Sequence, residues 1–503
     1  SDLRSRKGKM VPLIKNFIDN EFVASHTGRE LPVLTPFDQT EVAKLTISDE
    51  EDLNRAVACA KAALPAWQAM TCKMRAQICM KMHSIIDSRL AEIAEVLRVE
   101  NGKASAEAMG SVAKGNEVLE FANAIPQMMT GEYMRVARDV TVTTRIDPLG
   151  VCCSIMPFNF PFMVPMWTLG NCIVSGNAFI MKPSRDVPMC ADVICQIAKE
   201  AGVPAGIIQS INGGRDITTK MCEHPDVKAV TFVGSSPVCE LVRDICHKTG
   251  KRCLAMGSAK NHMIVLPDAD LAMTTNDVVN SYSGSTGQRC MAAAVLNLCG
   301  TDKAHEEVMK MIVKTSEERT PGSGDRQIGP VIRKRAYEHI VNNIQKAIDE
   351  GAKLILDGRD WPKRFPDVCG KGYWIGPTIL EVEKDSFLVD LELFGPVLTV
   401  VRTKTHEEAI ELQNASRYGN ASCVYTSCGQ FAEYFATRMQ AGMIGVNIGV
   451  PVPREPFAFG GIKDSKYGDF DITGASGVRF FTEEIKVTTK WVMPRKQDMT
   501  WMD

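Results

Sequence analysis

Gly287-Gln288-Arg289-Cys290 follows a run of small residues, Ser283 to Gly287, a little past the middle of a 503-residue chain. Small residues allow the backbone to approach a bound molecule closely. Arg289 places a cation next to the thiol, and a neighbouring cation lowers the pKa of a cysteine. Most cysteines are small buried hydrophobes, however, so this segment taken alone favours an ordinary core position over a catalytic one. Features elsewhere in the chain reverse that preference.

The composition is that of an ordinary globular protein. Hydrophobic residues make up 45% of the chain and charged residues 23%, and a chain of this length predicts roughly two to four domains. Lys+Arg total 58 against 60 Asp+Glu, so bulk charge predicts no nucleic-acid partner. No apolar run of about 18 residues is uninterrupted, so no membrane-spanning helix is expected.

The 17 cysteines predict a reducing compartment. They lack the short regular spacing of a disulfide framework. Neither a Cys-x-x-Cys pair nor a His-Glu-x-x-His motif occurs, so no metal site is expected. Residues 1–10 carry Arg4, Arg6, Lys7 and Lys9 against Asp2 alone. That segment fits a cloning remnant, a disordered arm and the remainder of a transit peptide equally well.

Apolar runs alternate with helical patterns in two parts of the chain, which is typical of parallel α/β sheets. The residues before them predict short strands over 11–50, helices over 50–125 and a strand over 138–146. The first alternation predicts buried strands at 151–155, 178–181, 207–211 and 229–233. The second predicts strands at 262–266, 397–401 and 421–426, with helices near 303–318 and 332–350. The C-terminal segment predicts two more strands, at 478–481 and 485–489.

Open parallel sheets bind ligands outside the carboxyl ends of their strands, and two of the predicted strands end in residues suited to a nucleotide. Lys182 follows the second strand and offers an ammonium to ribose or phosphate oxygens. Gly234-Ser235-Ser236 follows the fourth and opens a helix whose free amides would face a pyrophosphate. In isolation, a solvated surface lysine and a plain connecting turn are the better interpretations of these two features.

Two further segments place polar and aromatic side chains next to predicted strands. In Pro157-Phe158-Asn159-Phe160-Pro161 the prolines fix the loop, and the Asn159 amide is suited to donate to an oxyanion. An Asx turn at the start of a helix explains that loop equally well. Glu392 and Phe394 precede the strand at 397–401. The carboxylate suits ribose hydroxyls and the ring suits a nicotinamide, although a turn with a buried phenylalanine is the better interpretation in isolation.

In this order, the segments resemble the motifs of the aldehyde dehydrogenase superfamily, and the resemblance covers residues 13–491. It rests on five motifs: Pro157-Phe-Asn159-Phe-Pro161, Lys182-Pro-Ser184, Phe232-Val-Gly234-Ser-Ser236, Gly287-Gln-Arg-Cys290 and Glu392-Leu-Phe394-Gly-Pro396. The resemblance implies an α/β, aldehyde dehydrogenase-like fold with two doubly wound parallel-sheet domains plus a β oligomerisation element.

The resemblance also implies boundaries and an assembly. The NAD(P)-binding domain would comprise residues 1–132 and 151–255, the catalytic domain 256–450, and the oligomerisation element and C-terminal tail 133–150 and 451–503. A homo-oligomer, either dimer or tetramer, would form by extending a sheet across subunits. The expected partner is otherwise a small-molecule aldehyde, with no nucleic acid and no membrane. The implied compartment is the mitochondrial matrix in a eukaryote and the cytoplasm otherwise.

By the same resemblance, Cys290 is the nucleophile, and the Asn159 side chain and the Cys290 amide form the oxyanion hole. The implied cofactor is NAD. The residues implied to bind it are Phe158, Lys182, Ser184, Arg185, Gly234, Ser235, Ser236, Glu392 and Phe394. Arg185 stands where relatives usually carry the glutamate that grips the adenosine ribose, so NADP stays open beside NAD.

Three details are similar to the branch of methylmalonate-semialdehyde dehydrogenases: Phe158 in its motif, Ala259-Lys260-Asn261-His262 and Pro451-Val452-Pro453. Where hydrolytic relatives read Glu-Leu-Gly-Gly, this chain reads Ala255-Met256-Gly257-Ser258. The carboxylate that would activate water against the thioester is therefore missing. A thiol with a pKa near ~8.5 supplies its own thiolate, so the resemblance implies acyl transfer to coenzyme A as co-substrate. Malonate or methylmalonate semialdehyde would give acetyl-CoA or propionyl-CoA.

Three alternatives stay open: an aldehyde dehydrogenase that releases free acid, a lineage slow in both reactions, and a dehydrogenase fold recruited for binding. For the substrate, Lys114 occupies the place of an arginine that binds the substrate carboxylate in that branch, Arg289 offers a second cation, and Phe162 would shape the pocket. A lysine offers a point charge where an arginine offers a fork, so the sequence leaves the identity of the acid open.

Overall fold

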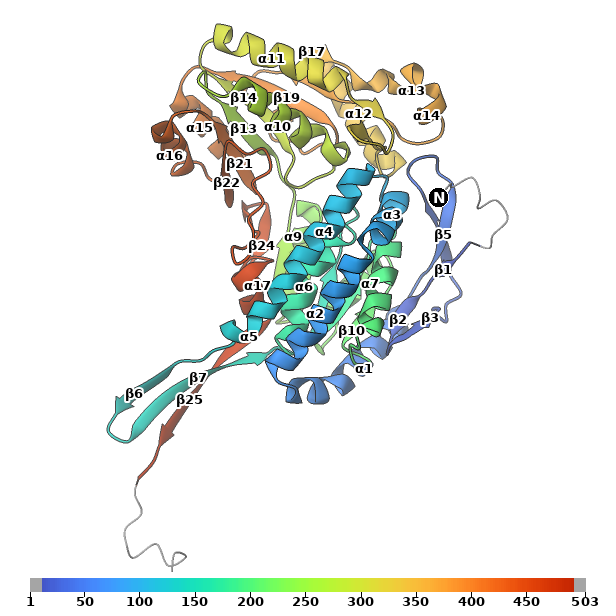
Figure 1. The fold of residues 1–503 in the computed structure, drawn as a ribbon, viewed down its shortest axis with the longest axis vertical. Helices are drawn as coiled ribbons and strands as arrows, with labels where there is room; N and C mark the ends of the chain where they lie inside the picture. The colour runs from blue at the N-terminus through green and yellow to red at the C-terminus, as the bar shows by residue number, and fades with distance from the viewer. Residues whose placement is uncertain (1–10, 493–503) are drawn as a thin grey trace, which may run out of the picture.

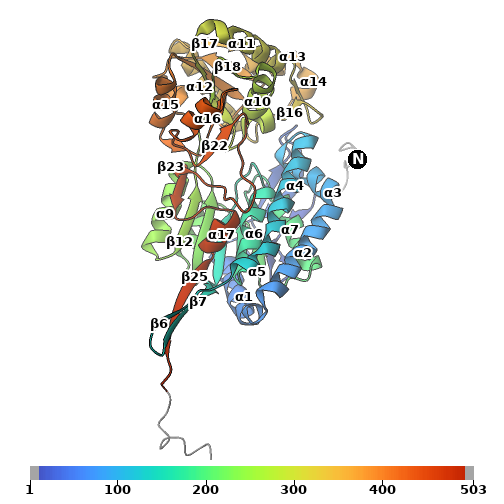
Figure 2. The ribbon, with the colours of Figure 1, turned by 60° about the vertical axis from the view of Figure 1, so that its left-hand side comes forward.

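Two mostly parallel β-sheets, each flanked by helices, form the body of the molecule, and a three-stranded sheet projects from it as an arm (Figure 1). The computed structural model describes residues 11–492. The basic segment 1–10, singled out in the sequence, lies outside the described residues. Figure 2 shows the two bodies one above the other, with the arm leaving the lower one.

The sheet of the lower body, here called the first sheet, has eight strands. Their order is β24 (Lys466–Gly468), β12 (Arg252–Met256), β11 (Val227–Val233), β8 (Val151–Ile155), β9 (Ala178–Lys182), β10 (Ile208–Ser210), β2 (Asn16–Ile18) and β3 (Glu21–Val23). The five strands from β12 to β10 run parallel, and the edge strands are antiparallel additions. β8 and β9 are buried at every position, which explains why their sequences are mostly apolar. The four strands predicted for this sheet are confirmed.

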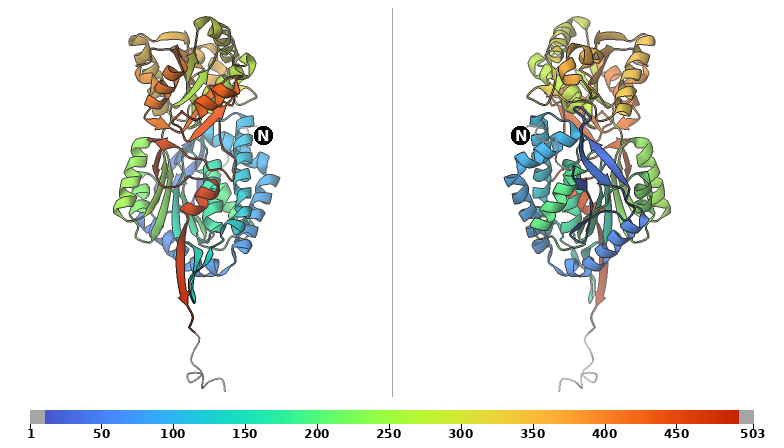
Figure 3. Two further views of the ribbon diagram at one scale, coloured as in Figure 1. Left: turned by 90° about the vertical axis from the view of Figure 1, so that its left-hand side faces the viewer. Right: turned by 90° about the vertical axis from the view of Figure 1, so that its right-hand side faces the viewer.

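Helices cover both faces of the first sheet, as the side views in Figure 3 show. They are α1 (Glu50–Ala69), α2 (Cys72–Ser88), α3 (Leu90–Asn101), α4 (Ser105–Phe121), α5 (Ile125–Met128), α6 (Met163–Val174), α7 (Met189–Glu200), α8 (Arg215–Glu223) and α9 (Ser236–Lys248). The Asp49 side chain caps α1 by accepting from the amides of Glu51 and Asp52. α6 is buried along its whole length, so the loop that leads into it, residues 157–161, starts from a rigid base.

The second sheet has seven strands, and all except the edge strand β17 run parallel. Their order is β17 (Lys353–Leu356), β18 (Thr378–Glu381), β19 (Val397–Thr403), β14 (Ala293–Cys299), β13 (Asn261–Val265), β21 (Ala421–Tyr425) and β22 (Met443–Val446). Its helices are α10 (Leu271–Ser283), α11 (Asp302–Glu317), α12 (Lys334–Asp349), α13 (Trp361–Arg364), α14 (Pro366–Cys369), α15 (His406–Ala415) and α16 (Gly429–Ala436). The strands and helices predicted for this part of the chain are confirmed.

The two sheets meet end to end. The chain leaves the carboxyl end of β12 and enters the amino end of β13 through residues 257–260. The carboxyl ends of the first sheet therefore face the amino ends of the second, and the candidate active site lies between them. Late in the chain, β24 returns to pair with β12, so part of the segment after residue 450 belongs to the first sheet.

The arm consists of β6 (Tyr133–Ala137), β7 (Val140–Pro148) and β25 (Thr482–Lys490). The strand predicted at 138–146 begins only at β7, because Asp139 has a φ of 61° and turns the chain back from β6. The strand predicted at 478–481 is wrong. Those residues lie in and just after helix α17 (Gly474–Phe480), which packs on α6, and the strand starts at Thr482. A short apolar run carries no period long enough to separate a helix from a strand.

Shorter strands complete the described chain: β1 (Leu13–Ile14), β4 (Glu30–Leu34), β5 (Glu41–Thr46), β15 (Thr320–Pro321), β16 (Gln327–Ile328), β20 (Tyr418–Gly419) and β23 (Ile462–Lys463). The first three form a small sheet of their own, which agrees with the short strands predicted over 11–50. Within residues 11–492, no helix combines the length and apolar character needed to cross a membrane.

Candidate active site

Cys290 lies between two cavities. One, of about 460 Å³ and here called the apolar cavity, is lined by Phe160, Met163, Trp167, Ile448, Val450, Val452 and Phe459, with Glu107, Ser111, Lys114 and Arg289 among its polar residues. The other, of about 560 Å³ and here called the sheet-edge cavity, is lined at the strand ends by Phe158, Asn159, Gly234, Ser235 and Ser258 and from the second body by Glu392 and Phe394. Among the residues lining these two cavities, Cys290 alone belongs to both.

The segment before Cys290 has an unusual backbone. Ser285, Thr286 and Gly287 all have positive φ, between 48° and 65°, and such conformations persist where the surroundings enforce them. A Cβ added to Gly287 would lie 2.1 Å from the Gly395 carbonyl oxygen. The small residues therefore allow this loop to pack against the backbone that follows Glu392. That contact explains the glycine at position 287, while Ser285 of the same run lines the apolar cavity.

Two asparagines hold the main chain at the cysteine. The Nδ2 atoms of Asn261 and Asn420 donate to the Cys290 carbonyl over 2.8 and 2.9 Å. Asn261 opens β13 and Asn420 precedes β21, so neighbouring strands of the second sheet carry both side chains. Because the carbonyl is fixed from two sides, the orientation of the Cys290 peptide is fixed with it.

Burial raises the pKa of the Cys290 thiol to about 12, and the charge of Glu392 acts in the same direction. The amides of Cys290 and Met291 and the Arg289 guanidinium lower this pKa, but to a smaller extent. Arg289 also donates to Glu107 over 2.9 Å, which neutralises much of its field. The expected activation of the thiol by Arg289 is therefore outweighed, and the thiol of the free protein is protonated near neutral pH.

This protonation predicts a steep pH dependence of alkylation. Only the thiolate reacts with iodoacetamide, so the rate at Cys290 should rise about tenfold per pH unit below its pKa. Because the Glu392 charge raises that pKa, Glu392→Gln should accelerate the reaction at pH 8. Mass spectrometry of the Cys290 peptide measures both effects, and the Cys428 peptide serves as the internal control. A rate that stays constant from pH 7 to 10 would show that the thiolate is already formed.

Asn159 lies beside the cysteine loop. Its side chain is only 6% exposed, and its Nδ2 donates to the Gln288 carbonyl over 3.0 Å. An amide nitrogen carries two hydrogens, so one remains for a further acceptor. The residue lines the sheet-edge cavity together with Cys290, which brings the two predicted catalytic residues into one site.

Glu392, Phe394 and Phe158 form one wall of the sheet-edge cavity. The Glu392 Oε1 accepts from the Ala259 amide over 2.9 Å, and burial raises the pKa of this carboxyl. The Phe158 and Phe394 rings meet edge to face with centroids 5.8 Å apart. Phe394 has a φ of 55°, so its backbone is held in a rare conformation. These three predicted cofactor residues are thus brought together.

Lys182, Ser184 and Arg185 lie at the end of β9, outside the wall of the sheet-edge cavity. The buried Lys182 Nζ donates to the carbonyls of Pro183 and Gly213 over 3.0 and 3.3 Å. Burial and the nearby Arg185 lower the pKa of Lys182 to about 8. Arg185 is exposed, and its guanidinium lies beside Gly214. These residues extend the site along the carboxyl edge of the first sheet.

The helix N-terminus at Ser236 offers fewer free groups than the sequence predicts. The Ser236 amide donates to the Ser258 hydroxyl over 3.2 Å, and the Ser236 hydroxyl donates to the Asp464 carbonyl over 2.6 Å. Pro237 has no amide hydrogen. Ser236 therefore joins α9 to the chain after β12. The Gly234 amide is also used, since it donates to the Met256 carbonyl over 3.0 Å, although Gly234 and Ser235 both line the cavity.

Three cations line the apolar cavity, and all are paired; Arg454 contacts Glu117 over 3.4 Å. Arg289 contacts Glu107 over 2.9 Å, and Lys114 contacts Glu117 and Glu455 over 3.3 and 3.7 Å. A Cβ at Gly284 would lie 2.7 Å from the Arg289 guanidinium, so the glycine makes room for this side chain. Two of the three predicted substrate residues, Lys114 and Arg289, line the apolar cavity, and Phe162 does not. It is fully buried and lines neither cavity; its neighbours Phe160 and Met163 do.

Several site residues were missed in the sequence. Glu107 enters from the first turn of α4, and Arg333, Arg335 and His339 stand at the sheet-edge cavity from the start of α12. None lies next to a recognisable motif. The sequence predicts the helices that carry them, over 50–125 for Glu107 and near 332–350 for the other three, but does not show which turn faces the site.

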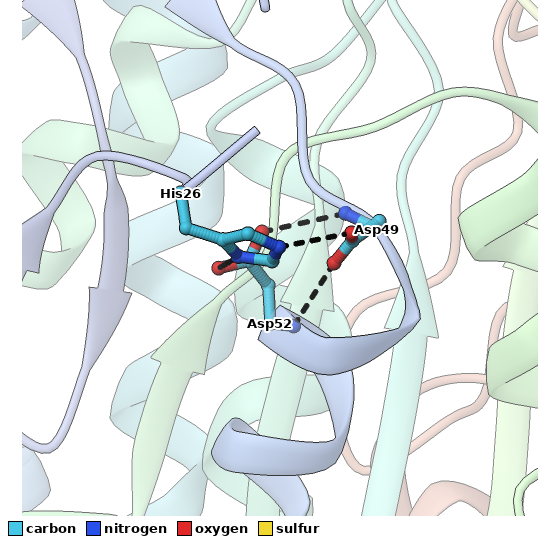
Figure 4. Close-up of side chains that lie close together, drawn as sticks. All are labelled: His26, Asp49 and Asp52. Atoms are coloured by element: carbon cyan, nitrogen blue, oxygen red, sulfur yellow. Dashed lines mark hydrogen bonds and ion pairs between the residues drawn. The ribbon is translucent and has the colours of Figure 1, made fainter. Parts of the chain in front are cut away.

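A group of potential metal ligands lies away from this site. His26, Asp49 and Asp52 have atoms within 4.8 Å of one another (Figure 4). Both carboxylates already serve the N-terminus of α1, where they form a capping box, and the half-exposed His26 contacts Asp49 over 3.2 Å. The arrangement is explained by helix capping, and we assign no metal to it.

Two α/β bodies, each built on a mostly parallel sheet, thus meet at a cysteine that borders two cavities, and sequence comparison identifies the class of protein. The sequence model of the Aldehyde dehydrogenase family matches residues 22–487. The chain belongs to that family.

Relatives within the family carry more specific names. The chain is 39% identical to malonate-semialdehyde dehydrogenase of Halalkalibacterium halodurans over 483 residues, covering 95% of this chain and 98% of the relative. It is 40% identical to malonate-semialdehyde dehydrogenase 1 of Geobacillus thermodenitrificans over 486 residues, covering 96% and 99%.

Solved structures give the same result. A crystal structure from Sinorhizobium meliloti 1021, provisionally described as methylmalonate-semialdehyde dehydrogenase complexed with NAD, superposes with a TM-score of 0.94 at 36% identity, covering 97% of this chain and 100% of that one. The structure of methylmalonate-semialdehyde dehydrogenase from Oceanimonas doudoroffii gives 0.92 at 33% identity, covering 96% and 99%.

Proposed function

We propose that this chain oxidises a carboxylate-bearing semialdehyde with NAD as the oxidant and passes the acyl group to coenzyme A. One observation carries the proposal: Cys290 is the shared wall of the apolar cavity and the sheet-edge cavity. An aldehyde in the first and a dinucleotide in the second would both reach its sulfur. The names of the relatives support a semialdehyde as substrate.

In the first half of the reaction, the Cys290 thiolate adds to the aldehyde carbon after its proton has left for solvent. The carbonyl oxygen becomes an oxyanion, to which the Asn159 Nδ2 and the Cys290 amide donate. Collapse of this adduct expels hydride and leaves a thioester on Cys290. NAD, when bound, supplies the acceptor for that hydride.

In the second half, a nucleophile must take the acyl group from Cys290. The segment 255–258 next to the sheet-edge cavity contains no acidic residue, so no carboxylate stands there to deprotonate water. Coenzyme A needs less help, because a thiol with a pKa near ~8.5 is partly ionised at neutral pH. The site therefore favours a thiol over water as the nucleophile that takes the acyl group from Cys290.

The substrate side suits a short aldehyde with a carboxylate at its far end. Lys114, Arg289 and Arg454 place three cations in a largely apolar cavity, and Lys114 and Arg289 can each exchange a protein carboxylate for that of the substrate. Malonate semialdehyde would then yield acetyl-CoA, carbon dioxide and NADH, and the methylmalonate analogue propionyl-CoA. The carbon–carbon bond to the carboxylate breaks, and its electron pair stays on the acyl group with one proton.

The residues of the sheet-edge cavity fit a dinucleotide. Glu392 offers a buried carboxylate to ribose hydroxyls, and Phe394 offers a ring held by Phe158. Arg333 and Arg335 bring positive charge to the same cavity, which suits the phosphates of NAD and of coenzyme A alike. The exposed Arg185 next to Gly214 keeps NADP open as a second cofactor.

The acyl acceptor is tested by a product assay. With malonate semialdehyde and NAD but without coenzyme A, NADH formation should stop after about one NADH per active site, because the thioester on Cys290 persists. With coenzyme A, acetyl-CoA should accumulate in step with NADH. Chromatography of the products distinguishes acetyl-CoA from free acid. Continuous turnover without coenzyme A, giving free acid, would contradict the proposal.

One observation favours the alternative of free-acid release. The charge of Glu392 acts on Cys290, and the pKa of this carboxyl is raised by burial. A carboxylate with a raised pKa is a better base towards water. If continuous free-acid release is found, Glu392 is the first residue to replace.

We also propose a homo-oligomer that forms through the arm. Tyr133, Met134 and Val136 on β6 are 71%, 64% and 50% exposed, and Trp491 beyond β25 is 80% exposed. An exposed edge strand with apolar side chains is a ready surface for a second subunit. Either a dimer or a tetramer would cover this exposed strand. We propose the domain boundaries given in the sequence analysis, except that β24 (Lys466–Gly468) belongs with the first sheet, because it pairs with β12. By the resemblance, the compartment is the mitochondrial matrix in a eukaryote and the cytoplasm otherwise.

A further inference from the structure

The turn between α3 and α4 lies directly against the loop that carries Asn159. In this turn, Asn101 Nδ2 donates to the Phe158 carbonyl over 2.7 Å. Two residues later, the Lys103 ammonium lies 3.6 Å from the centroid of the Phe160 ring. Each neighbour of Asn159 is therefore held by one residue of the turn, and Asn159 itself lies between the two contacts.

Lys103 is an unusual residue to find here. It is 3% exposed, and among the described residues it forms no ion pair with a carboxylate. Its ammonium has the Phe160 ring and the Ser111 hydroxyl, 3.3 Å away, as partners. Burial lowers the pKa of Lys103 to about 7, while Glu107 opposes that shift and Arg289 adds to it. A buried ammonium with so few partners is destabilising, so packing alone does not explain it.

The turn is also rigid. Gly102 has a φ of 83° at the end of α3, and a Cβ there would lie 3.3 Å from Pro330. A Cβ at Gly329 would lie 1.8 Å from the Gly102 carbonyl oxygen. The Gly329 carbonyl in turn accepts from Thr286 of the cysteine loop over 2.9 Å. Gly329 thus touches both the turn and the loop that presents Cys290.

We propose that Asn101 and Lys103 are positioning residues, which hold the Asn159 amide at the correct place relative to the Cys290 amide. An oxyanion hole works because its donors are fixed before charge develops, and Asn159 has two side-chain torsions to fix. Asn101 locks the backbone before it, and the ammonium of Lys103 locks the ring after it. The inference rests on the proposed role of Asn159 in the oxidation.

Lys103→Met tests it with the charge removed and the side-chain length kept. We expect kcat to fall roughly 10- to 100-fold, as small displacements of catalytic groups do, with KM changed by less than about twofold. The melting temperature should stay the same or rise, because a buried charge has been removed. Lys103→Arg, which keeps a cation over the ring, should recover part of the loss. The control is Lys251→Met. Lys251 is a buried lysine directly before the amino end of β12, away from the site at the carboxyl ends, so its replacement should leave kcat unchanged.

The decisive measurement combines each variant with Asn159→Ala. If the turn acts through Asn159, Lys103→Met and Asn101→Ala should add no further loss of kcat once the Asn159 amide is gone. Equal losses with and without that amide would overturn the inference. Asn101→Ala keeps the test open should Lys103→Met fail to fold. A normal kcat for Asn159→Ala alone would instead show that Asn159 does not stabilise the oxyanion. That result would contradict the proposed function rather than this inference.

Discussion

Replacement of Cys290 by alanine should remove turnover. We expect kcat to fall by at least roughly 10⁵-fold, as it does when a covalent nucleophile is deleted. The reason is structural: among the residues that line the two cavities, Cys290 alone borders both, so no second nucleophile stands in reach of both an aldehyde and a dinucleotide. NADH formation by the purified variant, with and without coenzyme A, measures the loss.

The same variant must keep its fold and its affinity for the cofactor. NAD binding, followed by calorimetry, should be unchanged within about twofold, because the substitution removes a single sulfur atom and leaves the other lining residues of the sheet-edge cavity in place. Cys428→Ser, at a partly exposed cysteine that lines neither cavity, should be fully active. Mass spectrometry of the wild-type protein trapped with substrate and NAD should find the acyl group on Cys290. Normal turnover by Cys290→Ala would show that the nucleophile lies elsewhere.

Local sequence was sufficient to predict where the central strands of the first sheet end. β8 and β9 are buried at every position and β11 at most of its positions, so each contains an apolar run that ends near the carboxyl end of the strand. Asn159 and Lys182 lie at or just after those ends, so their place at the edge of the sheet could be predicted from local sequence, whereas their proposed roles rest on the family resemblance. The position of Glu392 was harder to predict. Its carboxylate is held by a hydrogen bond from the amide of Ala259, which is far away in the sequence.

Contacts between distant segments could not be predicted. Gly287 is small because Gly395 lies against it, and no pattern within the cysteine loop contains that fact. Ser236 has the sequence of a phosphate-binding turn, yet it is occupied by Ser258 and Asp464. Lys103 gave no signal, since a lysine after an asparagine and a glycine is usually a surface residue. In each case the deciding partner is supplied by the tertiary fold.

Asn159→Ala should slow the oxidation by roughly 10²- to 10³-fold, the loss found when one oxyanion donor is removed. Its Nδ2 already donates to Gln288, two residues before the cysteine, so the amide is held at the cysteine loop before any substrate arrives. Its contribution should therefore appear only as negative charge develops on the substrate oxygen. kcat should fall while KM changes little, since the donor acts on the transition state more than on the bound aldehyde.

A steady-state assay alone could hide this effect, because transfer to coenzyme A or product release can limit turnover in the wild-type protein. The hydride step should therefore be followed in a single turnover, with enzyme in excess over aldehyde and NAD saturating. Asn159→Asp is the matched variant: it keeps the shape but replaces the donor by a carboxylate, so it should be at least as slow as Asn159→Ala. A loss confined to KM, or an Asn159→Asp variant with the wild-type rate, would show that the amide only helps to hold the substrate. If both variants slow the single turnover and leave NAD affinity intact, the donor acts on the oxyanion at Cys290.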